Sequence, residues 1–88
     1  MPYQLEFSPA AENHLRALTA RQQQIVLAAI AQQLFYEPTT ETRNRKPMGL
    51  NALAGWELRI ANLRVYYDVV ELDLSLQIVL VRAMGIKD

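Results

Sequence analysis

Two arginines, Arg59 and Arg64, lie on neighbouring stretches in which apolar and polar residues alternate. In residues 56–60 and 63–69 every second residue is large and apolar, and the arginines occupy intervening positions. This period of two is typical of β-strands that pack one face on a core and turn the other to solvent or a ligand. A guanidinium group on a rigid sheet is well suited to phosphate, because its planar donors grip two oxygens at once. We therefore interpret the two strands as a phosphate-binding element.

The segment from Arg43 to Arg64 is basic, although the 88-residue chain has a net charge of zero. This segment holds five basic residues and a single acid, Glu57, whereas the remainder holds four basic and eight acidic residues. A neutral chain lacks the broad positive surface that is typical of nucleic-acid-binding domains. The distribution predicts a small anionic site and not an extended one.

The arginine-bearing strands need other elements to position them. Residues 3–7 alternate in polarity and predict a first strand, and the apolar run 76–84 predicts a last one, after a turn around Asp73. Two helices separate the first strand from the arginine pair, and a polar, basic loop runs from Thr39 to Ala54. The order β-α-α-β-β-β predicts an α+β fold, with a two-helix hairpin packed on one face of a mostly antiparallel four-stranded sheet.

Both helices begin with recognisable capping residues. Ser8 is expected to cap the first helix, with Pro9 at its first position. Thr19 and Gln22 have the spacing of a capping box for the second helix, which must end before Pro38.

Length and composition point to a single domain spanning residues 1–88. The chain has no cysteine, no signal-peptide pattern and no apolar run of the ~20 residues that span a bilayer. We expect a cytoplasmic protein. No spacing of metal ligands and no glycine-rich phosphate loop occurs, so we expect neither a metal nor a cofactor.

Five motifs in this order resemble the RelE/ParE superfamily of type II toxin–antitoxin toxins. They are Tyr3–Ala11, Lys46-Pro47-Met48, Trp56–Ile60, Leu63–Tyr67 and Ala83–Lys87. RelE-like members of this superfamily are mRNA interferases that cut mRNA in the ribosomal A site, and ParE-like members inhibit DNA gyrase. Both are silenced by a cognate antitoxin protein. The basic segment favours the RelE-like branch, and hence a translation-inhibiting, RNA-binding endoribonuclease.

The resemblance implies roles for individual residues. Arg64 matches the strand arginine that stabilises the scissile phosphate, Arg59 and Lys46 lie near basic positions of the family, and Lys87 matches a basic position after the last strand. We predict these four as the catalytic set. We further predict that RNA is contacted by Arg43, Arg45, Tyr66 and Arg82.

Metal-independent RNA cleavage requires a base for the 2′-hydroxyl, cations for the phosphate and an acid for the leaving 5′-oxygen. Arginine serves the second task but is a poor base, because its pKa exceeds ~12. Lys46 or Lys87 could move a proton if its surroundings lowered its pKa. Tyr66 could carry a proton or stack on a base.

Several features leave alternatives open. Gly85-Ile86-Lys87 stands where many relatives have Gly-His-Arg or Gly-His-Lys, and the given sequence ends at Asp88 without the extension of some nucleases. A ParE-like gyrase inhibitor without nuclease activity and a degenerate toxin that only binds its antitoxin therefore remain alternatives. A homodimer and a toxin–antitoxin hetero-oligomer also both remain open.

Other interpretations concern single side chains. Arg64 could pair with Asp68 in a cross-strand charge network. Arg59 could be an ordinary solvated sheet residue, and the Arg43–Lys46 run a solvated loop. His14, the single histidine, is interpreted as a surface or helix-packing residue.

Overall fold

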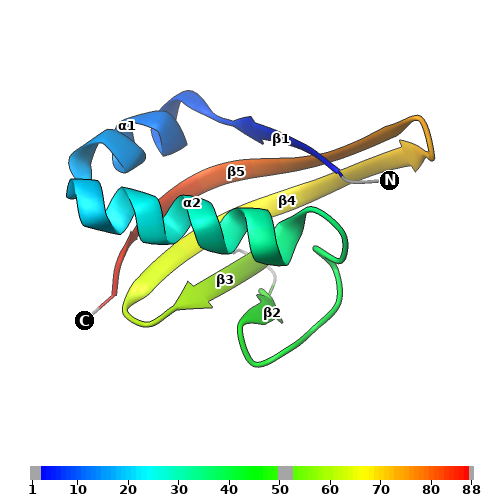
Figure 1. The fold of residues 1–88 in the computed structure, drawn as a ribbon. Coiled ribbons are helices and arrows are strands. Elements are labelled where there is room, and N and C mark those ends of the chain that lie inside the picture. Colours follow the sequence, from blue (N-terminus) through cyan, green and yellow to red (C-terminus); the bar gives the residue numbers. More distant parts are fainter. Residues whose placement is uncertain (1–2, 50–52, 88) are drawn as a thin grey trace.

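The α+β class predicted from the sequence is confirmed. The computed structural model describes residues 3–49 and 53–87, so part of the expected loop and the chain end at Asp88 lie outside the described residues. The elements follow one another in the order β-α-α-β-β-β-β (Figure 1). They are β1 (Gln4–Phe7), α1 (Pro9–Ala17), α2 (Ala20–Leu34), β2 (Arg45–Pro47), β3 (Trp56–Ile60), β4 (Leu63–Asp73) and β5 (Leu76–Ile86).

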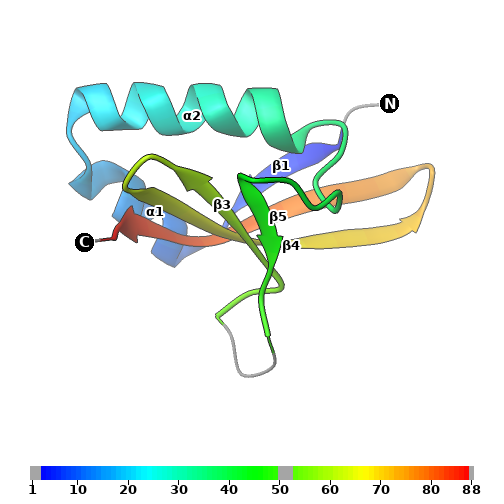
Figure 2. The same ribbon diagram turned by 90° about the horizontal axis from the view of Figure 1, so that it is seen from below.

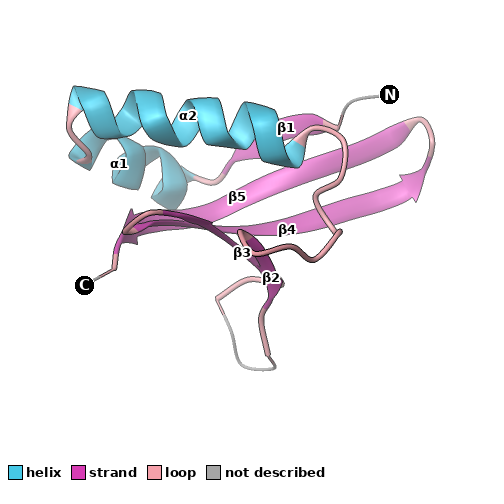
Figure 3. Ribbon diagram, turned by 60° about the horizontal axis from the view of Figure 1, so that its bottom comes forward, coloured by secondary structure: helices cyan, strands magenta, loops and turns pink. Residues whose placement is uncertain are grey.

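The strands form one sheet in the order β1-β5-β4-β3-β2. β1 pairs with β5 in parallel, and the other neighbours are antiparallel. α2 lies across one face of this sheet (Figure 2), and α1 lies on the same side (Figure 3). The sheet therefore has a helix-covered face and an open face, and the strand alternation decides which side chains go to each.

The described residues form a sheet of five strands, so the expected count of four was wrong. The additional strand, β2, lies within the segment that we expected to be a loop and pairs with the outer side of β3. Residues Arg45-Lys46-Pro47 have no apolar alternation that could reveal a strand. They pair through their backbone at the sheet edge, where the missing N–H of Pro47 is tolerated.

The expected helix caps are present. The Ser8 hydroxyl accepts a hydrogen bond from the Ala11 N–H, and Pro9 opens α1. Thr19 and Gln22 form a reciprocal capping box at the start of α2. Within residues 3–49 and 53–87, no helix is long and apolar enough to cross a membrane.

The core lies between the helices and the covered face of the sheet. Tyr67 is its largest fully buried side chain, stacking on Trp56 with ring centroids 6.3 Å apart. Its hydroxyl donates a hydrogen bond of 2.6 Å to the carbonyl of Pro38, which fixes the chain leaving α2. Burial raises the pKa of Tyr67 well above its ordinary value. Smaller apolar residues of α2 and the strands fill the rest: Val26, Ile30, Leu34, Leu58, Val65, Val79 and Val81.

Candidate functional site

The open face of β2, β3 and β4 gathers polar and charged side chains in two adjacent rows. The strand register places Lys46, Glu57 and Tyr66 side by side in one row. Arg59 and Arg64 are partners in the next. We call these five residues the open-face cluster. The basic segment and the arginine strands thus converge on one part of the sheet, as Figure 3 shows by the proximity of β2 to the β3–β4 hairpin.

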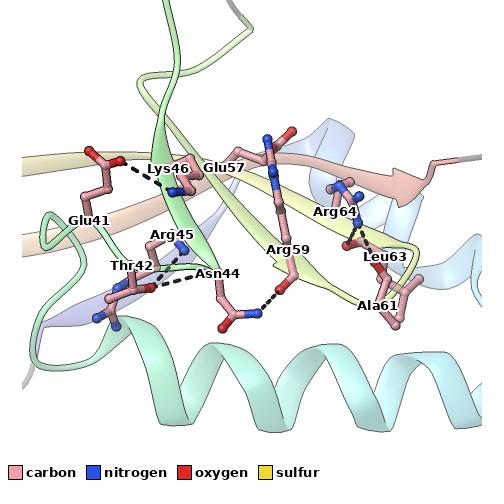
Figure 4. A network of polar contacts seen from close by, with 10 residues as sticks. All are labelled: Glu41, Thr42, Asn44, Arg45, Lys46, Glu57, Arg59, Ala61, Leu63 and Arg64. Atoms are coloured by element: carbon pink, nitrogen blue, oxygen red, sulfur yellow. Dashed lines mark hydrogen bonds and ion pairs between the residues drawn. The ribbon is translucent and has the colours of Figure 1, made fainter.

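Arg59 is the best exposed arginine of the strand pair. Its side chain rises on the side of the sheet opposite α2 (Figure 4), and 47% of it is exposed. Its Nε donates a hydrogen bond of 2.6 Å to Oε1 of Glu57, and its backbone is held by Asn44 through two hydrogen bonds, 2.7 Å and 3.0 Å long. The backbone of Arg59 is therefore fixed in position, and solvent can reach its guanidinium group.

Arg64 makes different contacts. Its Nη1 donates to the carbonyls of Ala61 and Leu63 at 2.7 Å and 2.9 Å, so the guanidinium folds along the β3–β4 turn (Figure 4). Its Nε is buried and has no hydrogen-bond partner among residues 3–49 and 53–87. Ala61, in that turn, has a φ of 53°, a left-handed conformation that favours glycine. The alternative interpretation, in which Arg64 pairs with Asp68, is not found among the described residues, where Arg64 donates to backbone carbonyls and Asp68 contacts Gly55 and Arg82.

Asp68 contacts other groups. Its Oδ1 accepts a hydrogen bond of 2.6 Å from the Gly55 N–H, and its Oδ2 lies 3.4 Å from Nη1 of Arg82. Arg82 is the extra residue of a β-bulge, because Tyr66 faces Ala83 whereas Tyr67 faces Val81. For Arg82 to contact RNA as expected, its guanidinium group would have to bind a phosphate while it lies next to the Asp68 carboxylate.

Lys46 lies at the sheet edge. Its Nζ is 3.5 Å from Oε2 of Glu41, and both side chains are substantially exposed. Such a surface ion pair is weak, and Lys46 therefore remains accessible to an anion. Arg43 is exposed in the preceding loop.

Arg45 lies on the other side of the sheet. Its side chain is 9% exposed and points toward the end of α2, where Nη1 donates 2.6 Å to the carbonyl of Gln33 and Nε 2.9 Å to that of Thr40. A cation here satisfies the Gln33 carbonyl in the last turn of α2 and the Thr40 carbonyl of the following loop. The sequence interpretation of Arg45 as an RNA contact is therefore corrected: it fastens β2 to α2.

Lys87 approaches the cluster from the far end of the chain. Its N–H donates 2.7 Å to the Asn62 carbonyl, beside the turn that holds Arg64. The neighbouring Ile86 is half-exposed. His14 lies on α1, where its Nδ1 accepts a hydrogen bond of 3.2 Å from the Met84 N–H. His14 is exposed, in agreement with its interpretation as a surface or helix-packing residue.

The structure brings two carboxylates to the cations, and the sequence interpretation assigned neither a role. Glu57 is buried within the open-face cluster, and Glu41 is exposed at its edge. The two-residue spacing of Glu57 and Arg59 within one strand was the signal for Glu57, whereas nothing in the sequence pattern indicated that Glu41 lies near Lys46. Among the described residues, no three His, Cys, Asp or Glu side chains are grouped to hold a metal ion.

The arrangement of the elements matches a known structure. A chain of the toxin–antitoxin complex RelBE2 from Mycobacterium tuberculosis superposes with a TM-score of 0.74, over 99% of this chain and 100% of that one. This chain has a RelE-like fold. Because the sequence identity is 22%, this likeness establishes the fold alone, and an activity has to be argued from the residues of the site. No protein-family model and no curated protein matches the sequence.

The RelE-like fold agrees with the resemblance inferred from the five sequence motifs. It places the open-face cluster on the uncovered side of the sheet, where a polymer could lie across several strands. Chemically, the cluster offers two guanidinium groups and an ammonium group for phosphate oxygens.

Proposed function

We propose that this protein is the toxin of a type II toxin–antitoxin system and that it cleaves mRNA in the ribosomal A site. The observation that carries the proposal is the open-face cluster, in which Lys46, Arg59 and Arg64 lie on adjacent strands of a RelE-like sheet. A ribosomal target would place the protein in the cytoplasm.

In the proposed reaction the RNA 2′-hydroxyl gives up its proton and its oxygen attacks the adjacent phosphorus. The bond from phosphorus to the 5′-oxygen breaks, so one product ends in a 2′,3′-cyclic phosphate, and the leaving 5′-oxygen takes up a proton and becomes the 5′-hydroxyl of the other. Arg59 and Arg64 stabilise the negative charge that develops on the phosphate. Lys46 and Lys87 serve as auxiliary cations and proton carriers, and Tyr66 offers a ring for base stacking. Arg43 contacts the RNA backbone. Arg82 also contacts the RNA when its guanidinium group is released from Asp68.

Primer extension on mRNA from a translation extract tests this assignment. We expect cuts that depend on ribosomes, and a loss of at least ~10-fold in cutting for Arg59→Ala or Arg64→Ala, because each removes a charge-assisted hydrogen bond to phosphate. Arg21→Ala is the matched control, since Arg21 is an exposed arginine on α2. Intact message at high protein concentration would refute the nuclease assignment.

A second candidate function is gyrase inhibition without chemistry. It is favoured by Ile86, an aliphatic residue at the position where many relatives have a histidine. A DNA supercoiling assay distinguishes the two functions, and growth arrest that survives Arg64→Ala would support gyrase inhibition. No response in either assay would indicate a degenerate toxin that only binds its antitoxin.

The antitoxin partner is proposed to cover apolar surface on the helix side as well as the basic face. A cavity of about 310 Å³ lies there, lined by Phe7, Leu15 and Leu27 with Glu12 and Arg16 beside them. Leu27 is 41% exposed, so together with Phe7 and Leu15 it offers apolar surface for a partner protein to cover. The product of a small acidic reading frame next to this one should co-purify with the chain, and Leu27→Asp should weaken the complex. The mass of the purified particle would distinguish a toxin–antitoxin hetero-oligomer from a homodimer.

A further inference from the structure

Glu57 is a buried acid on a face that is otherwise polar and solvent-exposed. Its side chain is only 9% exposed, although it lies between Lys46 and Tyr66 in the open-face cluster. Burying a carboxylate is costly unless a cation and hydrogen bonds compensate it. The compensating group is Arg59, whose Nε lies 2.6 Å from Oε1.

The way in which Arg59 is held leaves its outer end available. A guanidinium group has five N–H donors, and the contact to Glu57 uses the one on Nε. Within residues 3–49 and 53–87, no hydrogen bond engages either terminal nitrogen of Arg59. These nitrogens form the edge of the guanidinium that grips two oxygens of a phosphate. Arg64, by contrast, already uses Nη1 on the turn carbonyls.

The backbone beneath Arg59 is also fixed. The Arg59 N–H donates 2.7 Å to the Asn44 carbonyl, and the Asn44 side chain donates 3.0 Å to the Arg59 carbonyl. With the backbone and Nε both held, few rotations of this long side chain remain. Such prior ordering strengthens binding because less conformational entropy is lost when the ligand arrives.

We propose that Glu57 is a positioning residue that holds Arg59 by its Nε, so that the two terminal nitrogens meet the phosphate of a single-stranded RNA. The identity of the ligand rests on the proposed function, whereas the holding of Arg59 does not. The competing account is that Glu57 merely cancels positive charge. The two accounts predict opposite signs, since removing a charge-cancelling acid would strengthen RNA binding.

A double-mutant cycle on the full chain separates the accounts. The affinity for a fluorescent 12-nucleotide single-stranded RNA is measured for wild type, Glu57→Ala, Arg59→Ala and the double variant, below the lowest melting temperature of the four. We expect each single variant to bind roughly 10-fold more weakly. The double variant should bind as weakly as Arg59→Ala alone, because Glu57 acts through Arg59. Glu57→Gln should stay within about 3-fold of wild type, since its amide oxygen still accepts from Nε.

Tighter binding by Glu57→Ala, or losses that multiply in the double variant, would overturn the proposal. The NMR signal of the Arg59 Nε–H tests the holding role without any RNA. We expect slow exchange with water in wild type and Glu57→Gln and fast exchange in Glu57→Ala, and equal exchange in all three would also overturn the proposal. Wild-type protein that shows the expected exchange but binds or cuts no RNA would instead refute the proposed function.

Discussion

The two faces of β3 and β4 are built from alternating residues of the same segments, yet their side chains make contacts of different kinds. On the covered face Leu58, Val65 and Tyr67 are fully buried against the helices. On the open face Arg59 and Arg64 reach carboxylate and carbonyl oxygens within the sheet itself. The covered face contributes stability through burial, whereas the open face holds charged groups in defined positions. Function can therefore reside on one face while the other secures the fold.

Replacing one residue on each face, at neighbouring positions of β2 and β3, should show the largest difference in stability between the covered and the open face. Leu58→Ala is expected to lower the free energy of unfolding by about 2–5 kcal/mol, because it opens a cavity in the core. Lys46→Ala, on the adjacent strand and the open face, is expected to change it by less than about 0.5 kcal/mol. Urea denaturation measures both, and similar losses would contradict the division between the faces.

Tyr67 places a polar hydroxyl group on the largely apolar covered face. Tyr67→Phe leaves the Pro38 carbonyl without its donor, which should cost about 1–3 kcal/mol. Burial raises the pKa of Tyr67, so the folded state resists ionisation. The contribution of the neutral, buried Tyr67 to the free energy of unfolding is fully present below the unfolded pKa of ~10. This contribution is lost as the pH rises above that value.

Denaturation series at neutral pH and above pH ~10 test this. Wild type should lose stability over that range more steeply than Tyr67→Phe. Equal slopes for the two proteins would show that Tyr67 does not ionise on unfolding.

One position on the open face should also affect stability. Arg59→Ala leaves the buried Glu57 carboxylate without its cation, and we expect a loss of about 1–2 kcal/mol. Glu57→Ala should cost less, because solvent can hydrate the exposed guanidinium that remains. Thermal melts of the two variants in the same buffer give the order, and the reverse order would argue that Arg59 does not compensate Glu57.

A small gain in stability is expected at the β3–β4 turn. Ala61→Gly removes the cost of a left-handed alanine but adds flexibility to the unfolded chain, so a net gain below about 1 kcal/mol is expected. The variant should leave RNA cutting near the wild-type rate, as the Ala61 carbonyl that holds Arg64 is retained. A destabilised variant would show that the turn is not strained by its alanine.

Local signals in the sequence were sufficient for most of the fold. The caps at Ser8 and Thr19 depend on residues within one helical turn, and the alternation around Arg59 and Arg64 depends on neighbours in one strand. The strand β2 escaped prediction because its pairing uses the backbone and carries no side-chain pattern. Its presence could be inferred only after the place of β3 was known.

The site was only partly predictable. Strand parity alone placed Arg59 and Arg64 on the same face, and it would also have placed Glu57 there. The burial of Arg45 depends on where α2 ends relative to β2, which is a tertiary property. The hydrogen bonds that turn Arg64 toward the Ala61 carbonyl likewise follow from turn geometry and not from residue spacing.

Amide NMR during titration with a short single-stranded RNA tests most directly whether the open face is the anion-binding face. The account predicts that the largest chemical-shift changes fall in β2, β3 and the start of β4, and that Arg59→Ala abolishes most of them. The amides of α1 and α2 serve as the internal reference and should change little. Changes centred on the helices, or a titration unaffected by Arg59→Ala, would contradict it.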